Sequence, residues 1–366
     1  MPKWITSAPV GLKSSASFLE VDFKKIAEAL IGHPVDRLEL CRGGRNSRVF
    51  QAICGNDTFI LKSYPFKTSD PRDRFGTEIK ALKYYEANRN PYTPRLLGVD
   101  IPRSMALLEW IDGFPVNPPT PSDMDQAIDF IARTHVAEIN GGEAFGLATE
   151  SCLCGAYLER HIDSRLEKFA AVALQEPELK RFLVDELAPV MESARNFAHG
   201  ATFATPLPQH RRCLIPADFG FHNALKTAGG QMYFIDFEYF GWDDPVRLAA
   251  DFLLHPGMEL DEEKQRRFRR GMIAIFQADE GFEQRLLHLS PLYGIRWALI
   301  LLNEFLPERW QARVFAGEGA SREEVKSLQL EKSRIALGKA VASMPKYPSI
   351  GLRIRAGAAH ENASRD

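Results

Sequence analysis

Two short segments near position 220 carry side chains suited to magnesium-dependent phosphoryl transfer. They read PADFGFHN (216–223) and FIDFE (234–238), and each follows or ends a short β-like run. Mg²⁺ binds hard oxygen ligands, usually one or two from the protein with phosphates and water, so we expect Asn223 and Asp236 to be its ligands. Asp218 lies where a carboxylate can accept the proton of an attacking hydroxyl. Asp and Asn also favour turns, so the spacing of Asp218 and Asn223 alone predicts no more than a turn. The second β-like run, which ends at Asp236, favours a magnesium site over a plain turn.

A lysine and a glutamate in the first quarter of the chain have the spacing of a phosphate-holding ion pair. Lys62 ends the hydrophobic run Phe59-Ile-Leu, and Glu78 lies 16 residues later within a helical pattern. In kinases, a strand lysine paired with a helix glutamate holds the α- and β-phosphates of the nucleotide. A cation on a strand that packs against a core needs a partner, because an unpaired buried charge is costly. We therefore expect the ion pair, although either residue alone is compatible with an exposed side chain.

A glycine-containing loop, RGGRNSRV (42–49), comes one strand before the lysine strand. Glycine lets backbone N–H groups approach phosphate oxygens closely. The loop matches neither G-x-G-x-x-G nor the Walker pattern, and a plain hairpin turn is the alternative interpretation. Because of its position, we expect the backbone from Gly44 to Asn46 and the side chain of Ser47 to contact phosphate.

These motifs resemble those of the aminoglycoside phosphotransferase and choline kinase superfamily, which has a protein-kinase-like fold, and of the less characterised bacterial phosphotransferases. In that family a catalytic loop H-G-D-x4-N is followed by a strand that ends in I-D-x-E. The resemblance implies that Asp218 is the catalytic base, that Asn223 is a Mg²⁺ ligand and that Asp236 is the principal Mg²⁺ ligand. The chain departs from the family at Pro216-Ala217, where the family has His-Gly, and this departure bears on the geometry of the loop.

The resemblance also implies a place for the adenine base of ATP. The segment Leu107-Leu-Glu-Trp-Ile111 stands where kinases have the hinge between their lobes. The Glu109 carbonyl and the Ile111 amide are the groups that the resemblance assigns to the base. An edge strand without a ligand is the alternative for this segment.

The elements expected around these residues form an α+β, two-lobed, protein-kinase-like fold. Residues 1–34 are expected to form a leader and a helix, and 35–112 a nucleotide-binding lobe with an antiparallel sheet in the order β-β-β-α-β-β. Residues 113–347 are expected to form a mostly helical lobe with the catalytic and acceptor-binding groups, and 348–366 a disordered tail. Helical patterns cover 123–139 with Ser122 as N-cap, 154–172, 177–198, 261–277, 282–305 and 321–343.

Acidic and aromatic residues cluster just after the second motif, in positions 236–251. Five carboxylates stand there against one base, Arg247, with Tyr239, Phe240 and Trp242 between them. Such a lining suits an amino-bearing alcohol, because carboxylates attract the cation and rings bind ammonium groups. Asp244 before a proline is alternatively a helix N-cap. The candidate acceptor contacts are Glu238, Trp242, Arg296 and Trp297, whereas we interpret His222 as a loop residue.

Composition excludes several other classes of protein. The 366 residues hold 46 Lys and Arg against 48 Asp and Glu, a net charge of −2, which argues against a nucleic-acid partner. The longest apolar run, 297–302, is too short for a membrane span, and the N-terminus lacks the apolar region of a secretory signal. Five sparse cysteines are expected to be reduced, which indicates a cytoplasmic protein without a membrane partner.

The sequence therefore predicts an ATP- and Mg²⁺-dependent enzyme that transfers the γ-phosphate of ATP to a hydroxyl of a small metabolite. Amino alcohols, sugars and amino sugars all remain open as the acceptor. The alternative from another class is a nucleotide-binding pseudokinase with a regulatory or scaffold role. A hydrolase that uses the same metal site is a third possibility.

Overall fold

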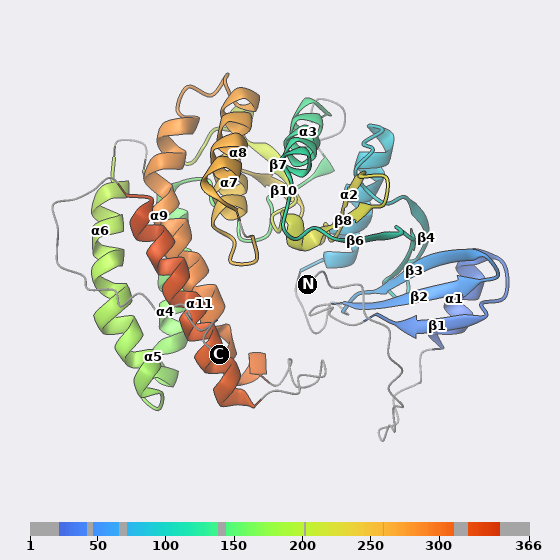
Figure 1. Cartoon of the computed structure of the whole chain (residues 1–366), viewed down its shortest axis with the longest axis horizontal. Coiled ribbons are helices and arrows are strands. Elements are labelled where there is room, and N and C mark those ends of the chain that lie inside the picture. The colour runs from blue at the N-terminus through green and yellow to red at the C-terminus, as the bar shows by residue number, and fades with distance from the viewer. Residues whose placement is uncertain are drawn as a thin grey trace, which may run out of the picture.

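The computed structural model has two lobes, one rich in strands and one mostly helical (Figure 1). It describes residues 22–41, 47–65, 72–137, 144–200, 203–258, 260–310 and 321–344. The predicted α+β, two-lobed architecture is confirmed. Most of the predicted leader and all of the predicted tail lie outside the described residues.

Five antiparallel strands form the sheet of the smaller lobe, in the order β1-β2-β3-β5-β4. They are β1 (Arg37–Leu40), β2 (Arg48–Cys54), β3 (Asp57–Ser63), β4 (Leu96–Asp100) and β5 (Met105–Glu109). Lys62 lies opposite Val49 of β2 and Ala106 of β5, so strand β3 has a partner on each side of the lysine. The predicted run of three hairpin-connected strands is confirmed.

Two helices accompany this sheet. Helix α1 (Phe23–Ile31) is capped by Asp22 and ends at Gly32, whose φ of 86° is the left-handed conformation that glycine adopts without strain. Helix α2 (Arg74–Ala87) buries the face that carries Glu78 and Tyr85. The Tyr85 ring lies against aromatic rings of the larger lobe, among them Phe237 at a centroid distance of 5.0 Å. Helix α2 therefore packs against both lobes and can link their positions.

The larger lobe is built mainly from helices. They are α3 (Pro121–Ala137), α4 (Gly155–Ala173), α5 (Pro177–Arg181), η2 (Phe182–Leu187), α6 (Ala188–Ala198), η3 (Gln209–Arg211), η4 (Phe221–Asn223), α7 (Pro245–Leu254), α8 (Glu262–Ile275), α9 (Phe282–Leu301), η5 (Leu302–Phe305) and α11 (Arg322–Ala342). Helix α9 is buried along most of its length and runs beside α11, with α4, α6 and α7 also packed on it. This apolar packing gives the helical lobe its core.

Short strands in the larger lobe carry the two predicted motifs. They are β6 (Gly113–Pro115), β7 (Cys213–Ile215), β8 (Ala224–Thr227), β9 (Met232–Phe234) and β10 (Gly241–Asp243). Strands β6, β8 and β9 pair in that order, and β7 pairs with β10. Asp218 and Asn223 lie between β7 and β8, and Asp236 follows β9.

Several predicted boundaries are wrong for local reasons. Helix α3 is capped by Thr120 and not by Ser122, because the Thr120 hydroxyl accepts from the Asp123 N–H while the Asp123 carboxylate accepts from the Thr120 N–H. The helix predicted for 177–198 contains a π-helical stretch, in which the Ala188 N–H reaches back to the Leu183 carbonyl. Strand β9 ends at Phe234, since Asp236 has a φ of 72° and cannot continue an extended strand.

None of the described helices is long and apolar enough to cross a membrane.

Candidate active site

A buried three-residue ion cluster joins the two lobes. The Lys62 ammonium lies 2.5 Å from Glu78 Oε2 of helix α2 and 3.0 Å from Asp236 Oδ1 of the larger lobe. All three side chains are buried. Burial alone would lower the pKa of Lys62, but the Asp236 and Glu78 carboxylates outweigh it and raise that pKa well above its usual range. Lys62 therefore keeps its proton and holds two carboxylates together.

The same cluster makes the carboxyl of Glu78 less acidic than usual. Burial raises its pKa; the Lys62 charge opposes this effect, and the nearby Asp236 carboxylate adds to it. The predicted Lys62–Glu78 ion pair is thus present in the structure, with Asp236 as a second partner of the lysine.

Asp218 and Asn223 face each other across a single tight turn. The Asn223 amide donates to the Asp218 backbone carbonyl over 2.9 Å and to Asp218 Oδ2 over 3.1 Å. The 3₁₀ turn η4 brings the two side chains together. The Asn223 carbonyl accepts from the Ile235 N–H over 2.9 Å, which ties this loop to the residue before Asp236. The three residues of the two motifs are therefore neighbours in space.

The oxygen of the Asn223 side chain fits a metal ligand. Asn223 Oδ1 is buried and has no hydrogen-bond partner within the described part of the chain. A buried amide oxygen without a partner is costly, and a hard cation satisfies it. Asp236 supplies a carboxylate from the adjoining segment. The donor set of one amide oxygen and one carboxylate matches Mg²⁺, which takes its other ligands from phosphates and water.

Two residues of the motifs, Ala217 next to Asp218 and Asp236 itself, adopt left-handed backbone conformations. Ala217 has a φ of 59° and Asp236 a φ of 72°. Non-glycine residues pay of order 1–2 kcal/mol for this conformation, and such strain gathers at functional sites. Ala217 stands where the resembling family has glycine. The loop therefore keeps a glycine-like backbone despite the replacement of His-Gly by Pro-Ala.

A cavity opens between the lobes next to the ion cluster, and the space in and directly in front of it is about 540 Å³. Its lining combines apolar side chains with four charged residues and includes the segment just after β5: Ile60, Lys62, Glu78, Pro94, Leu108, Glu109, Trp110, Ile111, Leu225, Ile235 and Asp236. Apolar walls of this kind suit a planar base, and the charged end suits phosphates with a metal. The predicted hinge residues Glu109 and Ile111 lie at the cavity, beside Ile60 and Leu108 of the sheet.

The predicted phosphate loop lies partly outside the described residues, since Gly44 and Asn46 fall between 41 and 47. Ser47 is described, and its hydroxyl donates to Glu238 Oε2 over 3.3 Å. Ser47 therefore lies beside the segment that follows Asp236.

Glu238, a predicted acceptor contact, binds other groups of the protein in this structure, and its role at an acceptor stays a prediction. Its buried carboxylate pairs with the Arg74 guanidinium at the start of helix α2, and Arg74 also donates to the Tyr239 hydroxyl over 2.5 Å. The pair attaches helix α2 to the Asp236 segment. Arg74 was not predicted from the sequence. One signal was available, because a cation in the first turn of a helix is unfavourable for the helix dipole and calls for a carboxylate partner.

The carboxylates of the acidic segment 236–251 are likewise paired with cations and donors of the protein itself. Asp243 pairs with Arg247 over 2.7 Å, and Asp244 caps helix α7 and binds Arg285 over 3.0 Å. Asp251 accepts from the Trp297 indole over 2.9 Å. The N-cap interpretation of Asp244 is confirmed, whereas the expectation of an acidic lining for an amino group is not supported by these contacts.

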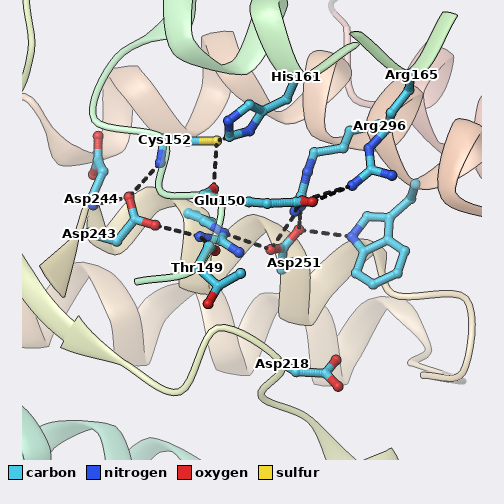
Figure 2. Close-up of polar contacts among 12 residues, drawn as sticks. Thr149, Glu150, Cys152, His161, Arg165, Asp218, Asp243, Asp244, Asp251 and Arg296 are labelled. Atoms are coloured by element: carbon cyan, nitrogen blue, oxygen red, sulfur yellow. Dashed lines mark hydrogen bonds and ion pairs between the residues drawn. The ribbon is translucent and has the colours of Figure 1, made fainter. Parts of the chain in front are cut away.

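Arg296 also points into this network (Figure 2), and Trp297 reaches it through its hydrogen bond to Asp251. Arg296 lies 3.2 Å from Asp251 and 3.1 Å from Glu150 Oε2, and Arg165 lies 2.8 Å from the same Glu150 oxygen. Burial would raise the pKa of Glu150, but the two arginines outweigh it and lower that pKa to about 2. The Glu150 carboxyl is therefore ionised at neutral pH. The acceptor contacts proposed for Trp242, Arg296 and Trp297 stay predictions.

A thiol and an imidazole meet at the edge of the same network. Cys152 Sγ lies 3.3 Å from His161 Nδ1 (Figure 2). Burial raises the pKa of the Cys152 thiol to about 12, and burial together with Arg296 lowers the pKa of His161 to about 4. Both groups are neutral near pH 7, so the pair does not have the character of an activated cysteine nucleophile.

Sequence comparison matches this chain to one family. The profile of the phosphotransferase enzyme family matches residues 37–286, more than half of the chain. A search of curated proteins finds no match.

Solved structures of small-molecule kinases have the same fold. Choline kinase LicA from Streptococcus pneumoniae is 16% identical, with a TM-score of 0.54 over 88% of this chain and 100% of its own. A spectinomycin phosphotransferase in complex with ADP and spectinomycin is 12% identical, with a TM-score of 0.55 over 87% and 97%. An ethanolamine kinase from Plasmodium vivax is 15% identical, with a TM-score of 0.50 over 84% and 83%. The predicted kinase-like fold and the predicted superfamily are confirmed.

Proposed function

The chain belongs to the phosphotransferase enzyme family, and we propose that it transfers the γ-phosphate of ATP to a hydroxyl group of a small metabolite. The observation that carries the proposal is the Lys62–Glu78–Asp236 cluster at the charged end of the cavity between the lobes. A buried lysine that bridges two carboxylates adds little to stability over an apolar core, and at the charged end of a cavity it is suited to binding phosphates.

Each residue has one role in the proposed reaction. Lys62, held by Glu78, binds the phosphates. Asn223 and Asp236 hold Mg²⁺, which when bound neutralises the charge that develops on the transferred group. Asp218 orients the acceptor hydroxyl and takes its proton as the hydroxyl oxygen bonds to the γ-phosphorus and the bond from that phosphorus to ADP breaks. The apolar cavity walls bind the base and exclude water from the phosphates.

Two structures with the same fold contain an adenine nucleotide together with a second small molecule. The spectinomycin phosphotransferase was solved with ADP and spectinomycin, and a related phosphotransferase was solved with ATP and streptomycin. For the present chain, the internal pairing of all five carboxylates in 236–251 removes the reason to favour an amino-bearing acceptor. Amino alcohols, sugars and amino sugars therefore enter a substrate screen with equal weight.

The alternative, a pseudokinase with a scaffold or regulatory role, rests on the replacement of His-Gly before Asp218 and on the irregular phosphate loop, of which residues 42–46 lie outside the described residues. The left-handed backbone at Ala217 and the contacts between Asp218 and Asn223 weaken the first of these arguments. A pseudokinase would bind nucleotide and yield no phosphorylated product.

The test is an ATP-consumption screen of the full chain against a panel of hydroxyl metabolites, with products identified by mass. Asp218→Ala is expected to lower turnover by roughly 10²–10⁴-fold, the usual contribution of a general base. Asp236→Ala is expected to abolish turnover. Asp185→Ala, at an exposed position of the larger lobe, is the matched control.

Free phosphate without a phosphorylated acceptor would identify a hydrolase in place of a transferase. Turnover by either site variant within about tenfold of the wild-type rate would refute the assignment of these aspartates.

A further inference from the structure

His222, four residues after Asp218, makes a direct contact with that carboxylate. Its Nε2 lies 3.1 Å from Asp218 Oδ1, and both side chains are only partly exposed. The other ring nitrogen, Nδ1, is buried and lacks a hydrogen-bond partner among the described residues. A neutral imidazole carries its hydrogen on one nitrogen, so the contact with Asp218 favours the tautomer with the hydrogen on Nε2.

We propose that His222 is a positioning residue, which holds the Asp218 carboxylate in the orientation that accepts the acceptor's proton. The inference rests on the proposed role of Asp218 as the base. The final torsion of an aspartate side chain has broad, shallow preferences, so a free carboxylate rotates. Here each oxygen has its own donor, with His222 on Oδ1 and Asn223 on Oδ2. A carboxylate oxygen has more than one lone pair, so an oxygen that accepts from one donor can also accept from an acceptor hydroxyl.

The ring of His222 packs against a second ring. It stacks on His255 with ring centroids 3.9 Å apart and planes 7° apart. The Gly257 N–H donates to His255 Nδ1 over 3.0 Å, and the Trp297 ring meets His255 edge-on at 4.5 Å. The Trp297 indole N–H is bound to Asp251 over 2.9 Å. A continuous series of contacts thus runs from the buried ion network to the proposed base.

Gly220 leaves the space that the ring occupies. A Cβ atom at this position would lie 2.7 Å from His222 Nδ1 and 2.8 Å from its Cε1. The ring is stacked and cannot yield without leaving Asp218. A Gly220→Ala variant is therefore a second way to displace the ring, without a change in either residue of the pair.

A metal site made of Asp218, His222 and His255 fits the geometry less well. One ligand atom from each lies within 4.8 Å of the others. An imidazole nitrogen binds a metal in the plane of its ring, and two stacked, nearly parallel rings do not direct their lone pairs at one ion. The stacking therefore favours positioning over metal binding.

The first experiment measures Mg·ATP turnover with water as the phosphate acceptor. His222→Phe keeps the ring stack and removes the donor, and it is expected to lower kcat by roughly 10- to 100-fold with little change in the KM for ATP. His222→Gln restores an N–H donor and is expected to recover most of the loss. Gly220→Ala is expected to behave like His222→Phe. His210→Phe, at an exposed histidine, is the control.

The second experiment does not depend on turnover. In protein with isotope-labelled histidine, Asp218→Ala is expected to shift the ring-nitrogen signals of His222 and to leave those of His210 unchanged. Identical His222 signals in the wild type and in Asp218→Ala would overturn the proposal.

The outcomes separate the two proposals. If the wild type hydrolyses ATP and Asp218→Ala does not, but His222→Phe matches the wild type in kcat, the positioning role is wrong and the role of Asp218 in the proposed function is unaffected. If His222→Phe loses activity and His222→Gln does not recover it, the ring acts only through packing and the proposal is also wrong. If the wild type neither binds nor turns over Mg·ATP, the proposed function fails, and with it the role of His222 in catalysis.

Discussion

Replacing Lys62 by methionine is expected to destabilise the protein strongly, whether or not a substrate is known. The Lys62 ammonium lies between Glu78 and Asp236, and one carboxylate oxygen from each of these residues and from Glu238 lies within 4.8 Å of the others. Methionine fills a similar volume but supplies no charge. Removing one partner of a buried ion pair costs about 3–5 kcal/mol, because the remaining charge is left uncompensated. That loss is a large part of the about 5–15 kcal/mol by which most domains are stable.

Protonation of Glu78 sets the pH dependence of this loss. The pKa of Glu78 is already raised by burial, and removing Lys62 takes away the charge that opposes this effect. A carboxyl whose pKa is higher in the folded state favours folding below its unfolded pKa, and this contribution disappears as the pH rises through the folded pKa. The Lys62→Met deficit relative to the wild type should therefore shrink as the pH falls from 8 towards 5.

Urea unfolding at several pH values tests both statements. Wild type, Lys62→Met, Glu78→Gln and the double variant form a cycle, in which the double variant should be more stable than the sum of the single effects by about 1–3 kcal/mol. Lys80→Met, at an exposed position of helix α2, is the control and should stay within about 0.5 kcal/mol of the wild type. A Lys62→Met loss below about 1 kcal/mol at pH 8, a deficit that does not change with pH, or additive effects in the cycle would refute the reasoning.

Three further predictions concern neighbouring residues. Asn223→Ala should raise the Mg²⁺ concentration needed for half-maximal ATP turnover by at least roughly tenfold, as measured by magnesium titration, and an unchanged requirement would remove Asn223 from the metal site. Glu150→Gln should lower the free energy of unfolding, measured with urea at pH 7, by about 1–2 kcal/mol; this is reduced from about 3 because the Glu150 side chain is 42% exposed. The pKa of Glu150 is lowered to about 2 beside Arg165 and Arg296, so the difference in stability between wild type and variant should disappear as the pH falls from about 4.5 towards 2. Ala217→Gly should stabilise the protein by about 0.5–1 kcal/mol by relieving the left-handed backbone, and a destabilised variant would contradict that account.

The residues that the sequence identified best are those whose types are constrained by chemistry over short distances. Asp218, Asn223 and Asp236 lie within two short motifs, and the two strands around them limit where the side chains can go. Lys62 and Glu78 were recognisable because a charged residue at the end of an apolar strand demands a partner. Periodicity predicted most helices for a similar reason, since the apolar face repeats within a few residues.

Contacts between residues that are far apart in the sequence could not be predicted from local patterns. Glu238 was expected at the acceptor, but its partner Arg74 stands 164 positions earlier in the chain. The stack of His222 on His255 depends on a turn after helix α7 that has no periodic pattern. Strands β6, β8 and β10 were missed because three or four residues carry too little alternation to be recognised.

The acidic segment shows why a local count of charge is a poor guide to what a site binds. Five carboxylates in 236–251 faced one arginine in the linear sequence, yet Arg285 and Arg296 of helix α9 supply further cations to Asp244 and Asp251 from 41 and 45 residues away. Once these pairs form, the segment presents little uncompensated negative charge to a substrate. The groups that approach the proposed base are instead the rings of His222 and His255, backed by Trp297. Recognition of an acceptor next to Asp218 is therefore expected to rely on hydrogen bonds and ring contacts rather than on attraction of a cation, and neutral polyols become as strong candidates as amino alcohols.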